Sequence, residues 1–294
     1  MTWAQVARKD FEDAVRSKML WGLVGVFVAF MAFVLVVAIN TADAAEATSE
    51  AALGLTANFA QLFVPLIAMI AGYLAVVGER RTGSLRILLG YPHSRRDVVF
   101  GKFVGRSTVI AVTLAIGSAV SILLVALVIK SPDLANVAGL LTAIVLFGIS
   151  VAGLAVGISA SVTSRGRAMA LAIGSMLVFW LVWDAMAAGV YAAVTGSLPG
   201  LTAEGWYFLL KRLSPIGAFR TVAEGFVGGR VPPIFRLGIE EIPPNTPSEQ
   251  LVLSKRVAGQ LPFYLKNWFG AVTLAAWGVV PTLVGYLRFR RMDL

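Results

Sequence analysis

The sequence predicts an all-α integral membrane protein with six transmembrane helices. Hydrophobic residues make up 58% of the 294 positions and charged residues only 14%, whereas about a quarter of the residues in a soluble domain are charged. Six apolar stretches are long enough to cross a bilayer, which takes roughly 20 helical residues. Lys and Arg gather in the connections on alternate sides of these stretches.

An amphipathic segment opens the chain. Trp3, Val6 and Phe11 stand at helical spacing, and charged residues such as Arg8 and Glu12 fall largely on the other side. This pattern predicts an interfacial helix that lies along the membrane. The apolar run that follows is too long for the h-region of a secretory signal, so we expect it to stay as the first span.

The spans form a single transmembrane domain that takes up the whole chain, 1–294. A small external cap of short helices, residues 196–266, is expected between the fifth and sixth spans, and we call it the cap segment. The predicted spans cover about residues 19–39, 57–78, 107–129, 134–164, 168–195 and 267–287.

The distribution of positive charge predicts the orientation. The segments expected on one face carry sixteen Lys and Arg, whereas the short connections on the other face carry only Lys130. Because cytoplasmic loops hold the excess of positive charge, we expect a multi-pass protein of the plasma membrane with both termini in the cytoplasm. Topology also explains the net charge of +9, so no nucleic-acid partner is expected.

The positive-inside rule applies to short loops, and the cap segment is too long for it. Its external position therefore follows from the alternation of the other loops. Phe219, Val222 and Phe226 form an apolar stripe. Arg220 and Glu224 stand four residues apart on the far side, where an ion pair is expected. An extracytoplasmic partner is one possible ligand of this cap segment.

The connection between the second and third spans, 78–106, carries seven Lys and Arg and has a distinctive order of helix signals. Ser84 can cap a short amphipathic helix, which Pro92 ends. Ser94, followed three residues later by Asp97, predicts a capping box at the start of the next helix. The connection is therefore expected to hold a short helix between two long ones.

The same connection resembles the loop after the second span of ABC transporter permeases of the type-2 exporter class. The resemblance rests on the order Glu, Thr-Gly-Ser-Leu, Leu-Leu, Pro, Ser-Arg and Gly-Lys. In that family the loop forms a coupling helix that seats on a separate ATP-hydrolysing subunit. The residues that the resemblance assigns to docking are Glu79, Arg80, Thr82, Gly83, Ser84, Leu85, Arg86, Leu88, Leu89, Pro92, Ser94 and Arg95.

A second local match lies in the cap segment. Leu213-Ser214-Pro215 with Phe219-Arg220 resembles a segment before the last span in some of these permeases. Among them is the permease of the copper-handling transporter that serves nitrous oxide reductase maturation.

The sequence offers few residues that could support catalysis. Gly101-Lys102 is followed by Phe103 and has no Gly five residues before it, so the Walker pattern for phosphate binding fails. The chain has no Cys, and His93 is its single His, which leaves no metal site and no catalytic residue to assign. We therefore expect no enzyme activity and no cofactor in this chain, with ATP and Mg²⁺ on a partner ATPase.

Three polar residues in the predicted spans are candidates for a gate or a substrate path. Asp184 is charged and lies within the fifth span, and Asn58 and Gln61 lie at the outer end of the second. Ionisable residues in spans often serve transport. Asp184 also stands at interfacial depth beside Trp180 and Trp183, so an ordinary interfacial aspartate is the alternative, and the other two residues also suit helix contacts.

The sequence and the resemblance together predict the permease subunit of an ATP-driven exporter. Two copies, expected as a homodimer in membrane lipid, would form the path, and two ATPase subunits would bind their cytoplasmic loops. Two alternatives stay open: an ion-coupled secondary transporter, and a membrane scaffold for an extracytoplasmic partner. The first of these would call for ionisable groups near the midplane and usually for inverted repeats.

Overall fold

The structure is a computed structural model. It describes residues 3–16, 18–41, 49–82, 94–128, 133–235, 239–243 and 245–292. Its elements in chain order are α1 (Trp3–Val15), α2 (Lys18–Thr41), α3 (Ser49–Gly72), α4 (Val77–Thr82), α6 (Arg95–Val128), α7 (Leu134–Ser161), α8 (Arg165–Leu177), η1 (Val178–Val182), α9 (Trp183–Thr195), α10 (Gly205–Arg212), α11 (Pro215–Ala223), η2 (Ser248–Leu251), α12 (Leu253–Arg256), η3 (Phe263–Leu265) and α13 (Asn267–Arg290).

The all-α membrane class is confirmed. By length and composition, five helical stretches of the described chain can cross a membrane: Ala52–Glu79, Arg95–Gly117, Leu134–Ser161, Arg165–Thr195 and Asn267–Arg290. In the described part of α2, the predicted first span, the apolar stretch is the shorter Val24–Phe33. Five of the predicted spans thus have a counterpart, while the six-span layout stays a prediction.

Helix α7 forms the centre of the bundle and packs against α3, α6, α11 and α13. The contact with α13 is unusually close because Gly153 and Gly157 have no side chains. A Cβ atom on Gly153 would lie 2.0 Å from the carbonyl oxygen of Gly278. Thr282 of α13 adds a hydrogen bond from Oγ1 to the Gly153 carbonyl at 3.1 Å. The small residues therefore allow two backbones to touch, as in other membrane helix pairs.

The break between α3 and α4 is also supported by α7. The backbone N–H groups of Val76 and Val77 both donate to Ser159 Oγ, at 3.0 and 3.1 Å. These donors lie in the turn where the helix changes direction and would otherwise be unpaired in a buried place. Ser159 of α7 thus fixes the end of the second span to the bundle, before the chain enters the 83–93 connection.

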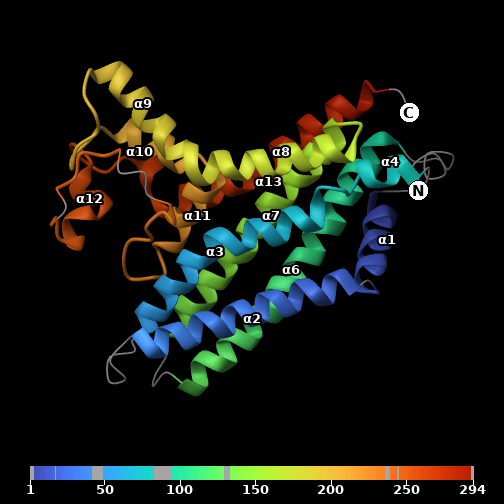
Figure 1. The fold of residues 1–294 in the computed structure, drawn as a ribbon, viewed down its shortest axis with the longest axis horizontal. Coiled ribbons are helices and arrows are strands. Elements are labelled where there is room, and N and C mark those ends of the chain that lie inside the picture. Colours follow the sequence, from blue (N-terminus) through green and yellow to red (C-terminus); the bar gives the residue numbers. More distant parts are fainter. Residues whose placement is uncertain are drawn as a thin grey trace.

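Helices α8 and α9 are joined by the π-helical turn η1 and form one long rod along the edge of the bundle (Figure 1). Only 11% of its apolar stretch is buried against the protein, compared with 72% for α7. Two tryptophans tether it: Trp180 Nε1 donates to the Gln61 carbonyl at 3.0 Å, and Trp183 Nε1 donates to the Leu210 carbonyl at 2.9 Å. Most of this rod therefore offers an apolar face to its surroundings.

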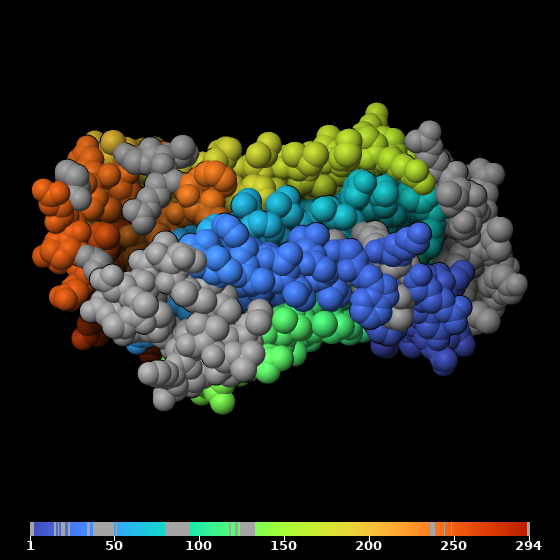
Figure 2. All heavy atoms as spheres, turned by 60° about the horizontal axis from the view of Figure 1, so that its bottom comes forward, coloured from blue at the N-terminus to red at the C-terminus, as the bar shows by residue number. Residues whose placement is uncertain are grey.

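The two ends of the molecule differ. One end brings together α1, α4 and the last turns of α13, whereas α9, α10 and α12 lie at the other (Figure 1). Between the ends, α2 lies along the surface over α3 and α6 (Figure 2). Helix α11 is buried against α7 and α13, and Phe219 stacks on Phe147 of α7 with ring centroids 4.6 Å apart. The cap segment is thereby joined to the core of the bundle.

Candidate functional site

The predicted docking residues lie on the connection between α4 and α6. Seven of them fall outside the described residues: Gly83, Ser84, Leu85, Arg86, Leu88, Leu89 and Pro92. The structure describes both flanks of this stretch. Glu79, Arg80 and Thr82 belong to α4, and Ser94 and Arg95 stand at the start of α6.

The capping box at the start of α6 is confirmed. The backbone N–H of Asp97 donates to Ser94 Oγ at 3.1 Å, and the backbone N–H of Ser94 donates to Asp97 Oδ2 at the same distance. The Ser94 hydroxyl also donates to Asp97 Oδ2 at 2.5 Å. These bonds satisfy donors at the helix N-terminus, and they define the residue at which α6 begins.

Arg95 joins the start of α6 to the end of α13. Its Nη1 atom donates to the carbonyl oxygens of Phe289, Arg290 and Met292 at 2.8, 3.1 and 2.6 Å. The guanidinium carbon also lies 5.6 Å from the centroid of the Phe289 ring. The last carbonyls of a helix lack partners within the helix and carry partial negative charge, so a guanidinium is well suited to this position.

Lys102 lies about two turns further along α6 than Arg95 and connects three elements. Its Nζ atom is 2.5 Å from Glu79 Oε1 of α4 and 2.6 Å from Asp10 Oδ1 of α1. Arg106 adds a second cation, with Nε 3.1 Å from Asp10 Oδ2. The Lys102 and Asp10 side chains are 6% and 3% exposed. Asp10, Glu79, Lys102 and Arg106 form one ionic cluster, which we call the ionic lock. Glu79 and Lys102 belong to the two helices that flank residues 83–93, the predicted docking connection.

Two glycines allow α1 to reach this lock. A Cβ atom on Gly101 would lie 2.7 Å from the Trp3 carbonyl oxygen, and one on Gly105 would lie 2.9 Å from Asp10 Oδ2. Sequence reasoning missed the role of Asp10. A signal was present, because Asp10 stands on the same face of the helix as Val6 and Ala14, where an acid is expensive unless it is paired.

At the opposite end, Gln61 and Asp184 come together, and Asn58 reaches the site through Gln61. The Gln61 side chain is 1% exposed, and its Nε2 donates to Asn58 Oδ1 at 3.3 Å and to the Pro232 carbonyl at 3.0 Å. Gln61 and Asp184 line one cavity of about 10 Å³, which is room for about one water molecule. The arrangement is a closed junction between the second span, the fifth span and the cap segment.

The predicted pair between Arg220 and Glu224 is wrong. Arg220 Nη1 lies 3.6 Å from Asp184 Oδ2 on the fifth span, and Glu224 Oε2 accepts from Arg212 Nη2 at 3.1 Å. Both residues lie near the end of α11, and partners on other elements take the place of the local one. The prediction failed because helix spacing describes neighbours along one helix and says nothing about side chains that packing brings nearby.

Glu240 is the centre of a second ionic cluster, within the cap segment. Its Oε1 atom accepts from Lys211 Nζ at 2.5 Å and from Tyr207 Oη at 2.6 Å, and its Oε2 accepts from Arg256 Nη2 at 3.1 Å. Burial by itself would raise the pKa of Glu240, but Lys211 and Arg256 outweigh it and lower the pKa to about 2. Burial, with the charge of Glu240, raises the pKa of Tyr207 above its usual value.

The geometry defines the class of this chain as an α-helical integral membrane protein with ionic clusters at both ends of its bundle. Its family follows from sequence comparison. The family model described as ABC-2 family transporter protein matches residues 4–294, and the chain belongs to this family.

Two curated relatives agree with this assignment. The chain is similar to the probable ABC transporter permease protein NosY of Stutzerimonas stutzeri, with 28% identity over 298 residues that cover 97% of each chain. It is also similar to the protein of the same name from Pseudomonas aeruginosa, with 27% identity over 233 residues. That alignment covers 76% of this chain and 84% of the relative. The resemblance seen in the docking connection is therefore borne out across the chain.

Proposed function

We propose that this chain is the permease subunit of an ATP-driven ABC exporter, in which separate ATPase subunits bind ATP and Mg²⁺ and dock on residues 83–93. Family membership supports the class. The observation that carries the coupling role is that the flanks of this connection are both fixed to other helices, by the ionic lock around Lys102 and by Arg95.

A connection that is fixed to other helices at both flanks can transmit a displacement to those helices. If an ATPase displaces residues 83–93, Lys102 passes the movement to α1 and α6, and Arg95 passes it to the end of α13. Helices α6 and α13 both pack on α7, and α11 packs on α7 and α13. Because packed helices move as rigid bodies rather than deform, the displacement can reach the junction of Gln61 and Asp184 at the far end.

The direction of transport and the sidedness are part of the proposal. The positive-inside count predicts that the end that holds α1, α4 and the last turns of α13 faces the cytoplasm, and their grouping at one end of the bundle supports this. The cap segment then faces the outside, where it can meet an extracytoplasmic partner. Residues 52–78, 107–117 and 134–161 of the candidate spans carry no charge, and Asp184 lies beside the cap segment, which gives the ion-coupled alternative little support.

A second copy of the chain is the proposed neighbour of the α8–η1–α9 rod. Its apolar stretch is the least buried of the five candidate spans found in the described chain. Lipid covers any apolar face in a bilayer, so exposure alone does not require a protein partner. A rod so loosely attached to its own bundle nevertheless leaves the largest face for close packing with a second permease.

The docking role is tested by purifying the complex in mild detergent. The expected co-purifying protein carries a Walker loop, and Leu88→Asp should abolish its binding because a charge replaces an apolar contact. Leu88→Met is the matched control and should retain the ATPase. Unchanged binding by Leu88→Asp would refute the docking role, and transport by vesicles that contain this chain without an ATPase would refute ATP coupling.

A further inference from the structure

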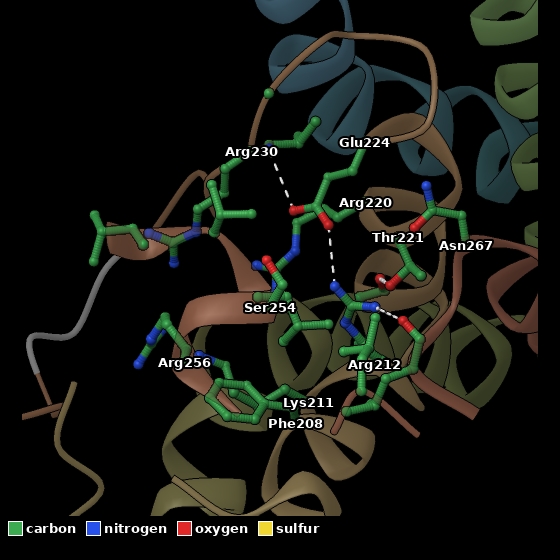
Figure 3. Close-up of a pocket in the computed structure, with 18 of the residues that line it drawn as sticks. Phe208, Lys211, Arg212, Arg220, Thr221, Glu224, Arg230, Ser254, Arg256 and Asn267 are labelled. Carbon is green, nitrogen blue, oxygen red and sulfur yellow. Dashed lines mark hydrogen bonds and ion pairs between the residues drawn. The ribbon is translucent and has the colours of Figure 1, made fainter. Parts of the chain in front are cut away.

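A cavity of about 390 Å³ lies between α10, α11, the segment 228–231, the segment 251–256 and the start of α13 (Figure 3). Small-molecule sites in proteins usually have volumes of about 300–1,000 Å³. The cavity is therefore large enough for a small ligand or for the polar part of a larger one. None of the described residues that flank the docking connection lines it, and it shares Gly217 and Arg220 with the small cavity between Gln61 and Asp184.

The lining of this cavity is strongly basic. Five cations contribute to it, whereas Glu224 is the one carboxylate among its lining residues. The cations are Lys211, Arg212, Arg220, Arg230 and Arg256. They come from α10, α11, the segment 228–231 and α12, so the fold gathers them from four separate parts of the cap segment.

Three of the five cations are held by the protein itself. Arg212 donates to the Leu265 carbonyl at 2.6 Å and to Glu224 at 3.1 Å (Figure 3). Lys211 and Arg256 both bind Glu240, which does not itself line the cavity. These contacts place the three cations firmly and leave their positive charge close to the cavity.

Arg220 and Arg230 keep most of their donors unused. Arg220 has one ion pair, to Asp184 at 3.6 Å, and no hydrogen bond to another described residue. Arg230 has neither an ion pair nor a hydrogen bond with any residue that the structure describes, although its side chain is half-buried. Burial, followed by repulsion from Arg256, lowers the pKa of Arg230. A guanidinium in such a place gains from an anion that takes up its donors.

We propose that this cavity binds a phosphate-type oxyanion, with Arg220 and Arg230 as its direct donors and Lys211, Arg212 and Arg256 as the surrounding field. A guanidinium offers a planar fork that matches phosphate oxygens, and charge-assisted hydrogen bonds of this kind are the strong ones. The oxyanion is either the headgroup of an anionic phospholipid or a soluble phosphate compound. This inference goes beyond the proposed permease function and does not depend on it.

The test compares the full-length wild-type protein with Arg220→Gln, Arg230→Gln and Lys255→Gln. Lys255 is the matched control, because it lies on α12 beside Arg256 but is exposed and does not line the cavity. Each of the four proteins is tested in two binding assays, one for each source of the oxyanion. Inorganic phosphate is titrated by calorimetry, and retained phosphatidylglycerol is counted by native mass spectrometry, with phosphatidylcholine as the reference lipid.

If the ligand is soluble, wild type and Lys255→Gln bind phosphate alike, and each cavity variant binds it about tenfold more weakly or worse, as loss of a charge-assisted hydrogen bond predicts. If the ligand is a lipid, the cavity variants lose a retained phosphatidylglycerol that the control keeps. Arg230→Lys, which keeps the charge, should recover part of the binding and shows that the variants fold. The proposal is overturned if neither assay separates the cavity variants from Lys255→Gln.

Discussion

Lys102 of α6 and Asp10 of α1 form a buried ion pair, with 2.6 Å between Nζ and Oδ1. They are 92 residues apart in the chain, and Glu79 of α4 completes the contact. The amphipathic first helix is therefore more than an attachment to the membrane surface. It is fixed to the two helices that flank the docking connection, so it can take part in any movement of that connection.

The first prediction concerns this ionic lock. Replacing Lys102 with Met should lower the stability by about 1–3 kcal/mol, because buried Asp10 then keeps only Arg106 and Glu79 loses its cation. The midpoint of thermal unfolding in detergent measures the effect. Arg8→Gln breaks an exposed ion pair on the same helix, Arg8 with Glu12, and should change the midpoint little. Equal midpoints for the two variants would show that the lock does not stabilise the fold.

The second prediction concerns the contact between α7 and α13. Gly153→Ala should destabilise the protein by about 1–3 kcal/mol, since the added Cβ meets the backbone of Gly278. Gly25→Ala is the matched control. A Cβ there meets nothing within 4 Å, so the better helix propensity of alanine should leave stability unchanged or raise it by up to about 1 kcal/mol. Thermal unfolding that ranks the two variants in the opposite order would contradict the close packing.

The third prediction is a pH dependence. Glu240 has an ordinary pKa of 4.5 and a folded pKa of about 2, so its ionised form stabilises the fold. The contribution is complete above about pH 4.5, and it is lost as the pH falls through about 2. Glu240→Gln should thus be less stable than wild type by on the order of 3 kcal/mol at neutral pH, and the difference should shrink between pH 4.5 and 2.

Glu249→Gln is the control for this measurement, because Glu249 is exposed and forms no ion pair with another described residue. Its unfolding midpoint should follow that of wild type across the same pH range. A difference between wild type and Glu240→Gln that does not depend on pH would show that the carboxylate charge adds nothing.

The fourth prediction concerns the second permease copy. The natural chain has no Cys, so a single introduced Cys reports one position without background. Ile173→Cys on α8 should form a cross-linked dimer with a short bifunctional maleimide in membranes, and Val280→Cys on α13 should not. Both native side chains are about equally exposed, 54% each. Cross-linking at Val280 alone would show that the dimer interface lies at α13 and not at the α8–η1–α9 rod.

Local patterns in the sequence were read correctly where neighbouring residues decide the structure. The capping box of Ser94 and Asp97 involves positions three apart, and the side chains can meet as soon as the helix starts. The apolar stretches predicted membrane helices for a similar reason, since each helix satisfies its own backbone in lipid.

Pairings between distant charges could not be derived in this way. Arg220 was assigned to Glu224 by spacing, yet it meets Asp184, and Glu224 meets Arg212. No partner was predicted for Asp10, yet it is buried against Lys102. Each case depends on how a helix is rotated and which helix lies beside it, and neither property is encoded in the spacing of charges along one element.

By itself, the sequence determined the membrane class, the helices that can span a bilayer and the start of α6, because burial in lipid and helix capping act over a single turn or a single span. Only the tertiary structure decided that Lys102 locks three helices together, that Arg95 holds the end of α13, and that five cations surround one cavity. Those arrangements arise from packing between segments far apart in the chain, where geometry selects the partner among many residues of suitable charge.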